Sequence, residues 1–179
     1  MFGGNELALT ERGVDVTAIP LDAICAANAV ANGVRVVEGS LEEACSSLGS
    51  EKFDCVLYLN VLHLSENPPQ IISLLRSVCD PGASIVVQCP NMLSAQALRR
   101  NLRDRHLFSS PDFATSRAHR TSAAIVHDWC RSAGYAVERT KGVNGRPFAG
   151  LRGRAGSFSD LLMSPELVIT ARQIGGGNP

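Results

Sequence analysis

The hydrophobic pattern of the chain alternates between short β-branched runs and longer segments of helical composition. One run, Phe53-Asp-Cys-Val-Leu-Tyr-Leu59, is nearly continuous, which is typical of a strand covered on both faces. The expected strands are 14–19, 34–38, 53–59, 84–89, 135–141 and 166–174. The expected helices are 7–12, 22–32, a helix that begins after Ser40, 68–79 and 121–133. Strands that alternate with helices predict a parallel sheet, because parallel neighbours need crossover connections.

Local signals mark several boundaries of these elements. Glu43 follows Ser40 at the spacing of a capping box. The segment 80–83, Asp-Pro-Gly-Ala, predicts a turn before the strand at 84–89, and Thr121 is the expected N-cap of the helix after it. Ligands of parallel α/β sheets bind at the carboxyl ends of the strands. We therefore expect function in the loops after residues 19, 38, 59 and 89.

Composition and charge narrow the class of protein. The 179 residues carry 17 basic and 17 acidic side chains, a net charge of zero, which argues against a general nucleic-acid binder. A run of about 18 apolar residues, as a membrane span requires, does not occur. The first residues do not resemble a secretory signal, so we expect a cytoplasmic protein. The length predicts one domain over 1–174, followed by a disordered tail at 175–179.

The six cysteines do not show the spacing of a metal site. The closest pairs are ten residues apart and no Cys-x-x-Cys occurs, so we expect no zinc site. Cys55 and Cys89 lie in strand-like runs and are expected to pack as small apolar side chains. In a chain of this size without a secretory signal, reduced thiols are the expectation.

Residues 91–120 interrupt the strand–helix rhythm and are expected to form a lid or acceptor-binding insertion. Their arginines fit either a solvated helix face or the recognition of a phosphate or carboxylate. These arginines are Arg99, Arg100, Arg103, Arg105, Arg117 and Arg120. Trp129, in the next helix, falls on its apolar stripe and is expected in the core.

The predicted loops, read in order, carry motifs of one known family. Residues 4–13 are similar to the end of a glycine-rich first motif with its helix, and residues 79–91, Cys-Asp-Pro-Gly-Ala-Ser-Ile-Val-Val-Gln-Cys-Pro-Asn, are similar to a Pro-Gly turn with the fifth strand. The other matching segments are 16–22, 36–42, 53–64 and 133–137. Together they resemble the class I S-adenosylmethionine-dependent methyltransferases. The resemblance implies a Rossmann-like, doubly wound, mostly parallel sheet, with 166–174 as an antiparallel strand beside 135–141.

The chain also departs from that family. Counterparts of the first, central strand and of the first two glycines of the Gly-x-Gly-x-Gly turn are missing, which would leave two rows of backbone groups unpaired. Pro20 stands where the family has the acid that binds the ribose, and Asp22 follows two residues later. We therefore expect weak cofactor binding. We also expect the chain to be either a fragment or a domain whose sheet is completed by a neighbouring domain or by a second copy in a homodimer.

The resemblance implies S-adenosylmethionine as cofactor and a small-molecule acceptor, such as a sugar, a lipid or a secondary metabolite. The implied cofactor residues are Gly3, Gly4, Leu21, Asp22, Ser40, Leu41 and Asn60. His119 is a candidate general base or acceptor ligand, and His63 is a second candidate; each also fits an ordinary packing role. We expect His119 to lie nearer Ser40 and Asn60 than His106 or His127 does.

Two other functions compete with methyl transfer. The missing glycines and Pro20 favour a degenerate, non-catalytic methyltransferase-like domain that serves as an interaction module. A nucleotide-binding oxidoreductase is disfavoured, because no Gly-x-Gly-x-x-Gly follows any predicted strand.

Overall fold

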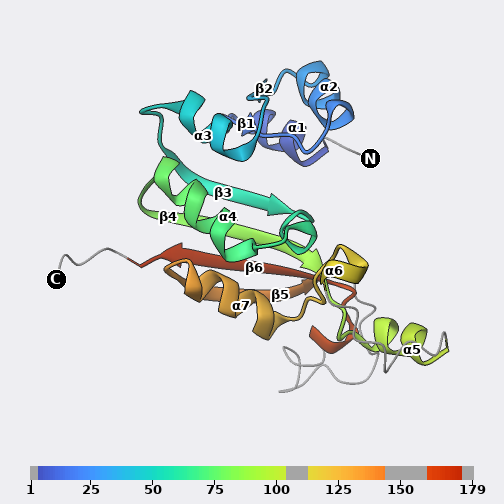
Figure 1. Cartoon of the computed structure of the whole chain (residues 1–179). Helices are drawn as coiled ribbons and strands as arrows, with labels where there is room; N and C mark the ends of the chain where they lie inside the picture. Colours follow the sequence, from blue (N-terminus) through green and yellow to red (C-terminus); the bar gives the residue numbers. More distant parts are fainter. Residues whose placement is uncertain (1–3, 104–112, 144–160, 175–179) are drawn as a thin grey trace. The chain divides into compact units, whose positions relative to one another are not determined.

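The computed structural model describes residues 4–103, 113–143 and 161–174 (Figure 1). The polypeptide divides into two compact units, residues 1–51 and residues 52–179. The single domain expected over 1–174, with its insertion at 91–120, stays a prediction. The tail expected at 175–179 lies outside the described residues.

The first unit holds three helices and two very short strands among its described residues. These elements are α1 (Gly4–Thr10), β1 (Thr17–Ala18), α2 (Ala23–Ala31), β2 (Arg35–Val36) and α3 (Leu41–Leu48). β1 and β2 pair in parallel over two residues each, so the expected strands are present but shorter than predicted. Among the described residues no third strand bonds to this pair, and an isolated pair of strands is only weakly stable.

Side-chain caps fix where two of these helices begin. The Cys25 N–H donates to Oδ1 of Asp22, the N-cap of α2, at 2.8 Å. At α3 the Glu43 N–H donates to Ser40 Oγ at 3.2 Å, and the Ser40 N–H donates to Glu43 Oε2 at 2.7 Å. The predicted capping box is therefore confirmed.

The second unit is built on a four-stranded sheet in the order β3-β4-β6-β5 (Figure 1). Its strands are β3 (Phe53–Leu59), β4 (Cys79–Pro90), β5 (Tyr135–Val143) and β6 (Glu166–Gln173). β3 and β4 are parallel, whereas β6 runs antiparallel to both β4 and β5. The predicted fold, mostly parallel with a terminal antiparallel strand beside 135–141, is confirmed.

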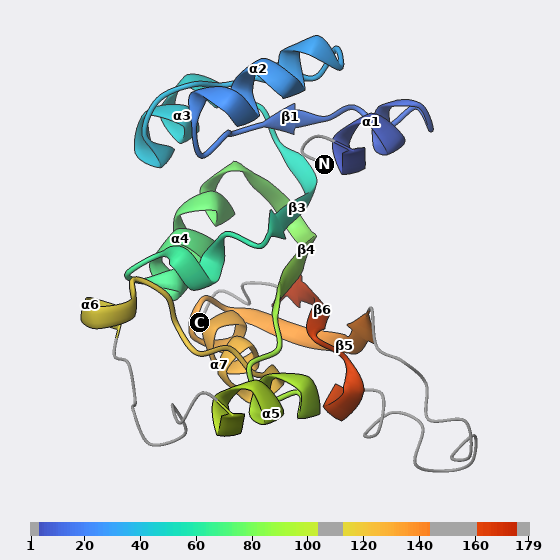
Figure 2. The ribbon, with the colours of Figure 1, turned by 90° about the vertical axis from the view of Figure 1, so that its right-hand side faces the viewer.

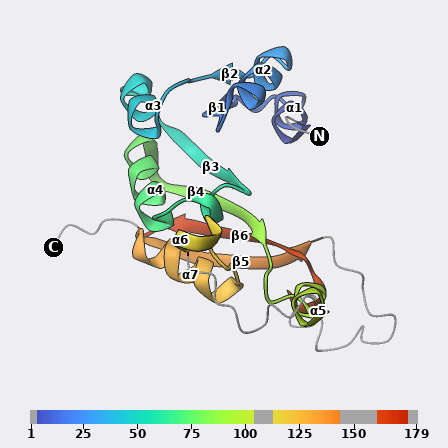
Figure 3. The same cartoon turned by 45° about the vertical axis from the view of Figure 1, so that its right-hand side comes forward.

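Helices α4 (Pro68–Leu75) and α7 (Ala123–Ser132) lie side by side over one face of this sheet (Figures 1 and 2). Between sheet and helices lies the core, which includes Ile72, Ile85, Val126 and Ile169, none of them exposed. The short helices are η1 (Leu62–Leu64), η2 (Arg76–Val78) and α6 (Phe113–Ser116). α5 (Ala95–Arg103) lies beyond the carboxyl end of β4 (Figure 3).

The environment of β3 differs from the prediction. Cys89, on β4, is fully buried as predicted, but Cys55 is exposed and Leu57 is 40% exposed. The predictions that Cys55 packs in a core and that 53–59 is covered on both faces are therefore wrong. The reason is position in the sheet: within the described residues β3 is an edge strand that pairs only with β4.

Two local boundaries also differ. The expected turn at 80–83 is a bulge inside β4, because Phe53 pairs with Cys79 while Cys55 pairs with Ser84. The N-cap of α7 is Ser122, whose Oγ accepts from the Ile125 N–H at 3.4 Å. Thr121, the predicted cap, instead donates its hydroxyl to the carbonyl of Pro90.

Candidate functional site

The second unit brings together His63 and His119, the two candidate histidines. His63 lies in η1, just after the carboxyl end of β3, and His119 lies between α6 and α7. The His119 N–H donates to the carbonyl oxygen of His63 at 2.7 Å. A main-chain bond therefore holds two segments that lie 56 positions apart in the sequence.

Two aromatic rings contact the imidazole of His119. The Phe113 ring stacks on it, with centroids 4.7 Å apart, and the Trp129 ring meets it edge-on at 5.4 Å. Its Nε2 lies 3.3 Å from the carbonyl oxygen of Glu66. Because a carbonyl oxygen only accepts, Nε2 carries the proton in this contact, and the lone pair of the neutral ring is on Nδ1. His119 therefore offers a basic nitrogen at a defined atom.

The imidazole of His63 is buried, with 9% of the residue exposed. Its Nδ1 has no hydrogen-bond partner in the part of the chain that the structure describes. Burial lowers the pKa of His63 below 6.5, and charge on His119 lowers that pKa further. His63 is therefore neutral at cellular pH.

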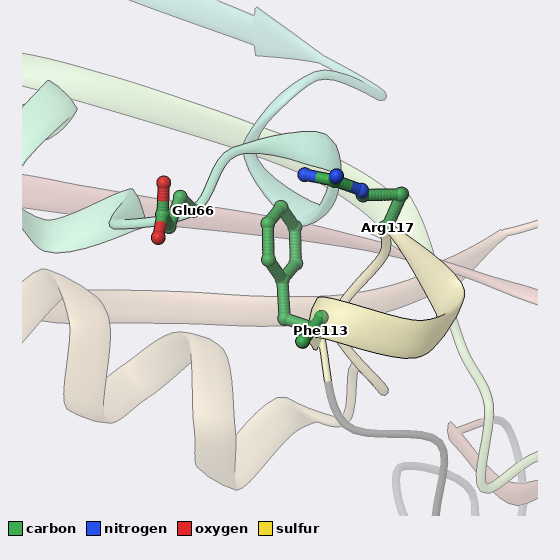
Figure 4. A pocket seen from close by; sticks show the side chains of 4 residues that line it. Glu66, Phe113 and Arg117 are labelled. Carbon is green, nitrogen blue, oxygen red and sulfur yellow. The ribbon is translucent and has the colours of Figure 1, made fainter.

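A pocket of about 380 Å³ is lined by Glu66, Phe113, Ala114 and Arg117 (Figure 4). Of these residues, Glu66 and Phe113 contact His119. Its lining comes from the segment after η1 and from the α6 region. Arg117 has a positive φ of 53°, and its N–H donates to the carbonyl of Phe113 at 2.8 Å, which ends α6. The backbone turn thus places the Arg117 side chain at this pocket.

Most predicted cofactor residues belong to the first unit. Gly4 begins α1, Leu21 is 69% exposed, and Leu41 is the first residue of α3. Asp22 and Ser40 are exposed N-caps, and the bond from the Cys25 N–H lowers the pKa of Asp22. Gly3 lies outside the described residues. Their role as a cofactor pocket stays a prediction.

Asn60 is the one predicted cofactor residue in the second unit. It follows β3 directly and has a positive φ of 57°. Its N–H donates to the carbonyl of Gln88 at 2.9 Å, which extends the pairing of β3 with β4 by one residue. Asn60 therefore stands at the carboxyl end of the sheet, three residues before His63.

Of the other histidines and arginines, some have contacts of their own and two lie outside the described residues. His127 bonds through Nε2 to Thr140 Oγ1 at 2.7 Å, and burial lowers the pKa of His127. His106 and Arg105 lie outside the described residues, so the expected ranking of histidines around Ser40 and Asn60 stays a prediction. Of the arginines, Arg117 lines the pocket, whereas Arg99 and Arg100 are exposed on α5.

Sequence reasoning missed two residues of this site, Glu66 and Phe113. Glu66 precedes a helix and Phe113 lies inside the irregular insertion, so neither belongs to a periodic pattern. Trp129 is buried, as predicted, but its ring also contacts His119. The signal available in advance was an aromatic residue within an arginine- and histidine-rich segment.

The described residues contain no cluster of three or more His, Cys, Asp or Glu that could hold a metal ion. In the same ranges, no helix is both long enough and apolar enough to cross a membrane. All six cysteines are free thiols.

The fold is that of the class I S-adenosylmethionine-dependent methyltransferases. A methyltransferase of this kind from Archaeoglobus fulgidus aligns over 96% of this chain and 81% of its own, with a TM-score of 0.68 and 15% identity. One from Mesorhizobium loti covers 96% and 87%, with a TM-score of 0.62 and 18% identity. The 1,6-didemethyltoxoflavin-N1-methyltransferase of Burkholderia thailandensis was solved with bound 1,6-didemethyltoxoflavin and S-adenosylhomocysteine. It aligns over 96% of this chain and 66% of its own, with a TM-score of 0.61 and 18% identity.

Within this class, the chain belongs to the MetW family, described as methionine biosynthesis protein MetW, whose family model matches residues 3–140. No curated protein matches the sequence.

Proposed function

We propose that this protein is an S-adenosylmethionine-dependent methyltransferase that acts on a small-molecule acceptor in the cytoplasm. The observation that carries the proposal is the main-chain bond of His119 to His63, which follows the carboxyl end of β3, together with a pocket whose lining residues Glu66 and Phe113 contact His119. Ligands of such sheets bind at this end. The similar structures are methyltransferases, and their fold supports the proposed function.

The residues present fit the cofactor in part. The carboxylate of Asp22 accepts the Cys25 N–H through Oδ1 and keeps further lone pairs that suit a ribose hydroxyl. The hydroxyl of Ser40 accepts the Glu43 N–H and bonds to the Glu43 carboxylate, so its remaining lone pair suits the amino group of adenine. When bound, the cofactor supplies a methyl group on a positively charged sulfur. The chain's own work is to bind, orient the acceptor and receive a proton.

His119 is the proposed general base. Its Nδ1 carries the lone pair when Nε2 donates to the carbonyl of Glu66, so Nδ1 takes the proton of an acceptor hydroxyl or amine. The main-chain bond to His63 positions the backbone of His119, and the contacts of its ring with Glu66, Phe113 and Trp129 orient the imidazole. His63, neutral because it is buried, does not place a second positive charge beside that base.

Calorimetric titration with S-adenosylhomocysteine tests the cofactor part of the proposal. We expect weak binding by the whole chain, weakened further in Asp22→Ala because the ribose loses its acceptor. Asp128→Ala, an exposed carboxylate on α7, serves as control. No binding at millimolar ligand, or equal binding by Asp22→Ala and the parent, would contradict the proposed cofactor site.

Methyl transfer from labelled cofactor to a mixture of small metabolites tests the catalytic part. His119→Ala should lower turnover by about 10²-fold or more if the imidazole removes the proton. His127→Ala, a histidine of α7 bonded to Thr140, is the matched control. Turnover unchanged in His119→Ala would contradict its role as base.

The second candidate is a non-catalytic methyltransferase-like domain that acts through interactions. The observation in its favour is Pro20, which replaces the acid that binds the ribose in the family that the chain resembles. It predicts no binding of S-adenosylhomocysteine and no methyl transfer by a chain that is folded by circular dichroism. Binding together with turnover would exclude it.

A further inference from the structure

Glu66 and Arg117 carry opposite charges on the lining of one pocket without neutralising each other. Within the described ranges, neither side chain forms an ion pair with any residue. Both are exposed, and Figure 4 shows them on opposite sides of the Phe113 ring. The pocket therefore presents a negative and a positive group at the same time, separated by an aromatic surface.

The backbone of Arg117 is unusual for a residue with a side chain. Its φ of 53° lies in the left-handed region, where glycine is the least strained residue. Residues with this conformation occur at helix ends, and strained non-glycine residues cluster at functional sites. Glycine would end α6 with less strain, so the guanidinium is the feature that an arginine adds at this turn.

We propose that the pocket binds the acceptor as a small zwitterion, an amino acid whose carboxylate meets Arg117 and whose ammonium group meets Glu66. This inference rests on the proposed function, because it names the substrate class for the same site. A guanidinium matches a carboxylate through two parallel hydrogen bonds, and a carboxylate accepts from an ammonium group. A ligand with only one charge leaves the opposite wall of the pocket unmatched.

The apolar face of Phe113 suits the carbon chain between or beside the two charges. His119 stacks on the same ring, so the bound molecule would contact an aromatic ring that itself contacts the proposed base. A zwitterion held at both charges would bind in one orientation.

A matched set of probes tests the charge requirement. L-alanine carries both charges, propionate lacks the ammonium group, and ethylamine lacks the carboxylate. Saturation-transfer NMR measures their binding, and fluorescence of Trp129, the only tryptophan, reports the neighbourhood of His119. We expect L-alanine to bind at millimolar concentration and the other two at least tenfold more weakly. Binding of propionate equal to that of L-alanine would overturn the proposal. So would no binding of L-alanine at about 50 mM, because a specific site of this kind should have a dissociation constant in the millimolar range.

Substitutions separate recognition from folding. Arg117→Gly removes the guanidinium and relieves the backbone, so we expect an unchanged or higher melting temperature and at least tenfold weaker binding of L-alanine. Glu66→Gln should weaken L-alanine by a similar factor, while leaving propionate unaffected. Arg120→Ala, an exposed arginine three residues further on, is the control. L-alanine binding that survives Arg117→Gly would overturn the assignment.

Competition with S-adenosylhomocysteine distinguishes this inference from the proposed function. We expect both ligands to bind together, because the pocket belongs to the acceptor. Displacement of L-alanine by S-adenosylhomocysteine would assign the pocket to the amino-acid end of the cofactor and overturn the inference. Binding of S-adenosylhomocysteine without L-alanine would defeat the inference alone, and the reverse result would defeat the proposed function alone.

Discussion

Asn91 closes the carboxyl end of β4 with its side-chain amide. It is 6% exposed, and its Nδ2 donates to the carbonyl oxygens of Leu161 and Ser164 at 2.7 and 2.9 Å. Its Oδ1 accepts from the Leu93 N–H at 3.3 Å. One amide therefore ties the segment that leads into β6 to the end of β4. Asn91→Asp replaces the donor with an oxygen that repels both carbonyls.

The size of the loss follows from these contacts. Removing both donated bonds, as in Asn91→Ala, should cost about 2–3 kcal/mol, because two carbonyl oxygens lose their partner. Asn91→Asp should cost about 3–5 kcal/mol at pH 7, since a buried charge without a partner is added. A loss of that size lowers the melting temperature by about 10 °C or more.

The penalty of Asn91→Asp should depend on pH. Burial and the facing carbonyls raise the pKa of the new carboxyl above its unfolded value of about 3.9. The folded state then binds the proton more tightly, so the variant is most stable at acid pH relative to Asn91→Ala and loses that stability as pH rises through the raised pKa. Protonated, the new carboxyl donates one of the two lost bonds.

Denaturant unfolding at pH 7 and pH 4.5, followed by fluorescence, measures these differences. Asn67→Asp is the control, because the exposed Asn67 uses Oδ1 to accept the Gln70 N–H at the start of α4. A carboxylate keeps that bond and suits a helix N-terminus, so we expect no loss of stability there. If Asn91→Asp and Asn91→Ala unfold together at pH 7, the assigned direction of the Asn91 amide is refuted.

Three further predictions concern other positions. Gly134 has a φ of +81°, so Gly134→Ala should lower stability by about 1 kcal/mol through backbone strain. The flexible end of Arg76, 2.5 Å from the added carbon, can move aside, and a melting curve equal to the parent's would contradict the prediction. Asn60, with a φ of 57°, should tolerate Asn60→Gly but lose about 1–2 kcal/mol in Asn60→Val, measured by denaturant unfolding; equal stability of the two variants would argue against the left-handed backbone. Burial keeps the pKa of His63 below 6.5, so the unfolded chain binds its proton more readily and stability falls as the pH drops below about 6.5. His63→Phe should make this fall shallower between about pH 7.5 and 5, with a residual slope from His127, and an unchanged slope would refute the lowered pKa of His63.

The sequence predicts most of the elements of the second unit because their signals are local. Alternating or continuous apolar runs define β3, β4, β5 and β6, and Gly134, with its positive φ, follows α7 as expected of a helix end. The capping box of α3 is a similar case, since its partners lie only three residues apart. The antiparallel direction of β6 came from the family resemblance rather than from its residues.

The environment of an element depends on its neighbours, and there local signals fail. Cys55 sits in an apolar run but is exposed, because exposure depends on which strand bonds to the far edge of β3. Glu66 and Phe113 meet beside His119 only because the chain between them returns to the end of the sheet. Thr121 is of a residue type that is common at N-caps, yet its hydroxyl donates to the carbonyl of Pro90 instead.

Main-chain groups supply several of the contacts that hold the candidate site together. The His119 N–H bonds to the carbonyl of His63, and the ring of His119 bonds to the carbonyl of Glu66. Two residues on, Thr121 receives the Met92 N–H at its carbonyl, at 3.0 Å, and donates its hydroxyl to Pro90. The segment before α7 is therefore tied to the ends of both β3 and β4. Substitution at His63 or His119 leaves the main-chain bond between them intact. The effect of such a substitution on activity therefore reports the chemistry of the imidazole more than a displacement of the segment before α7.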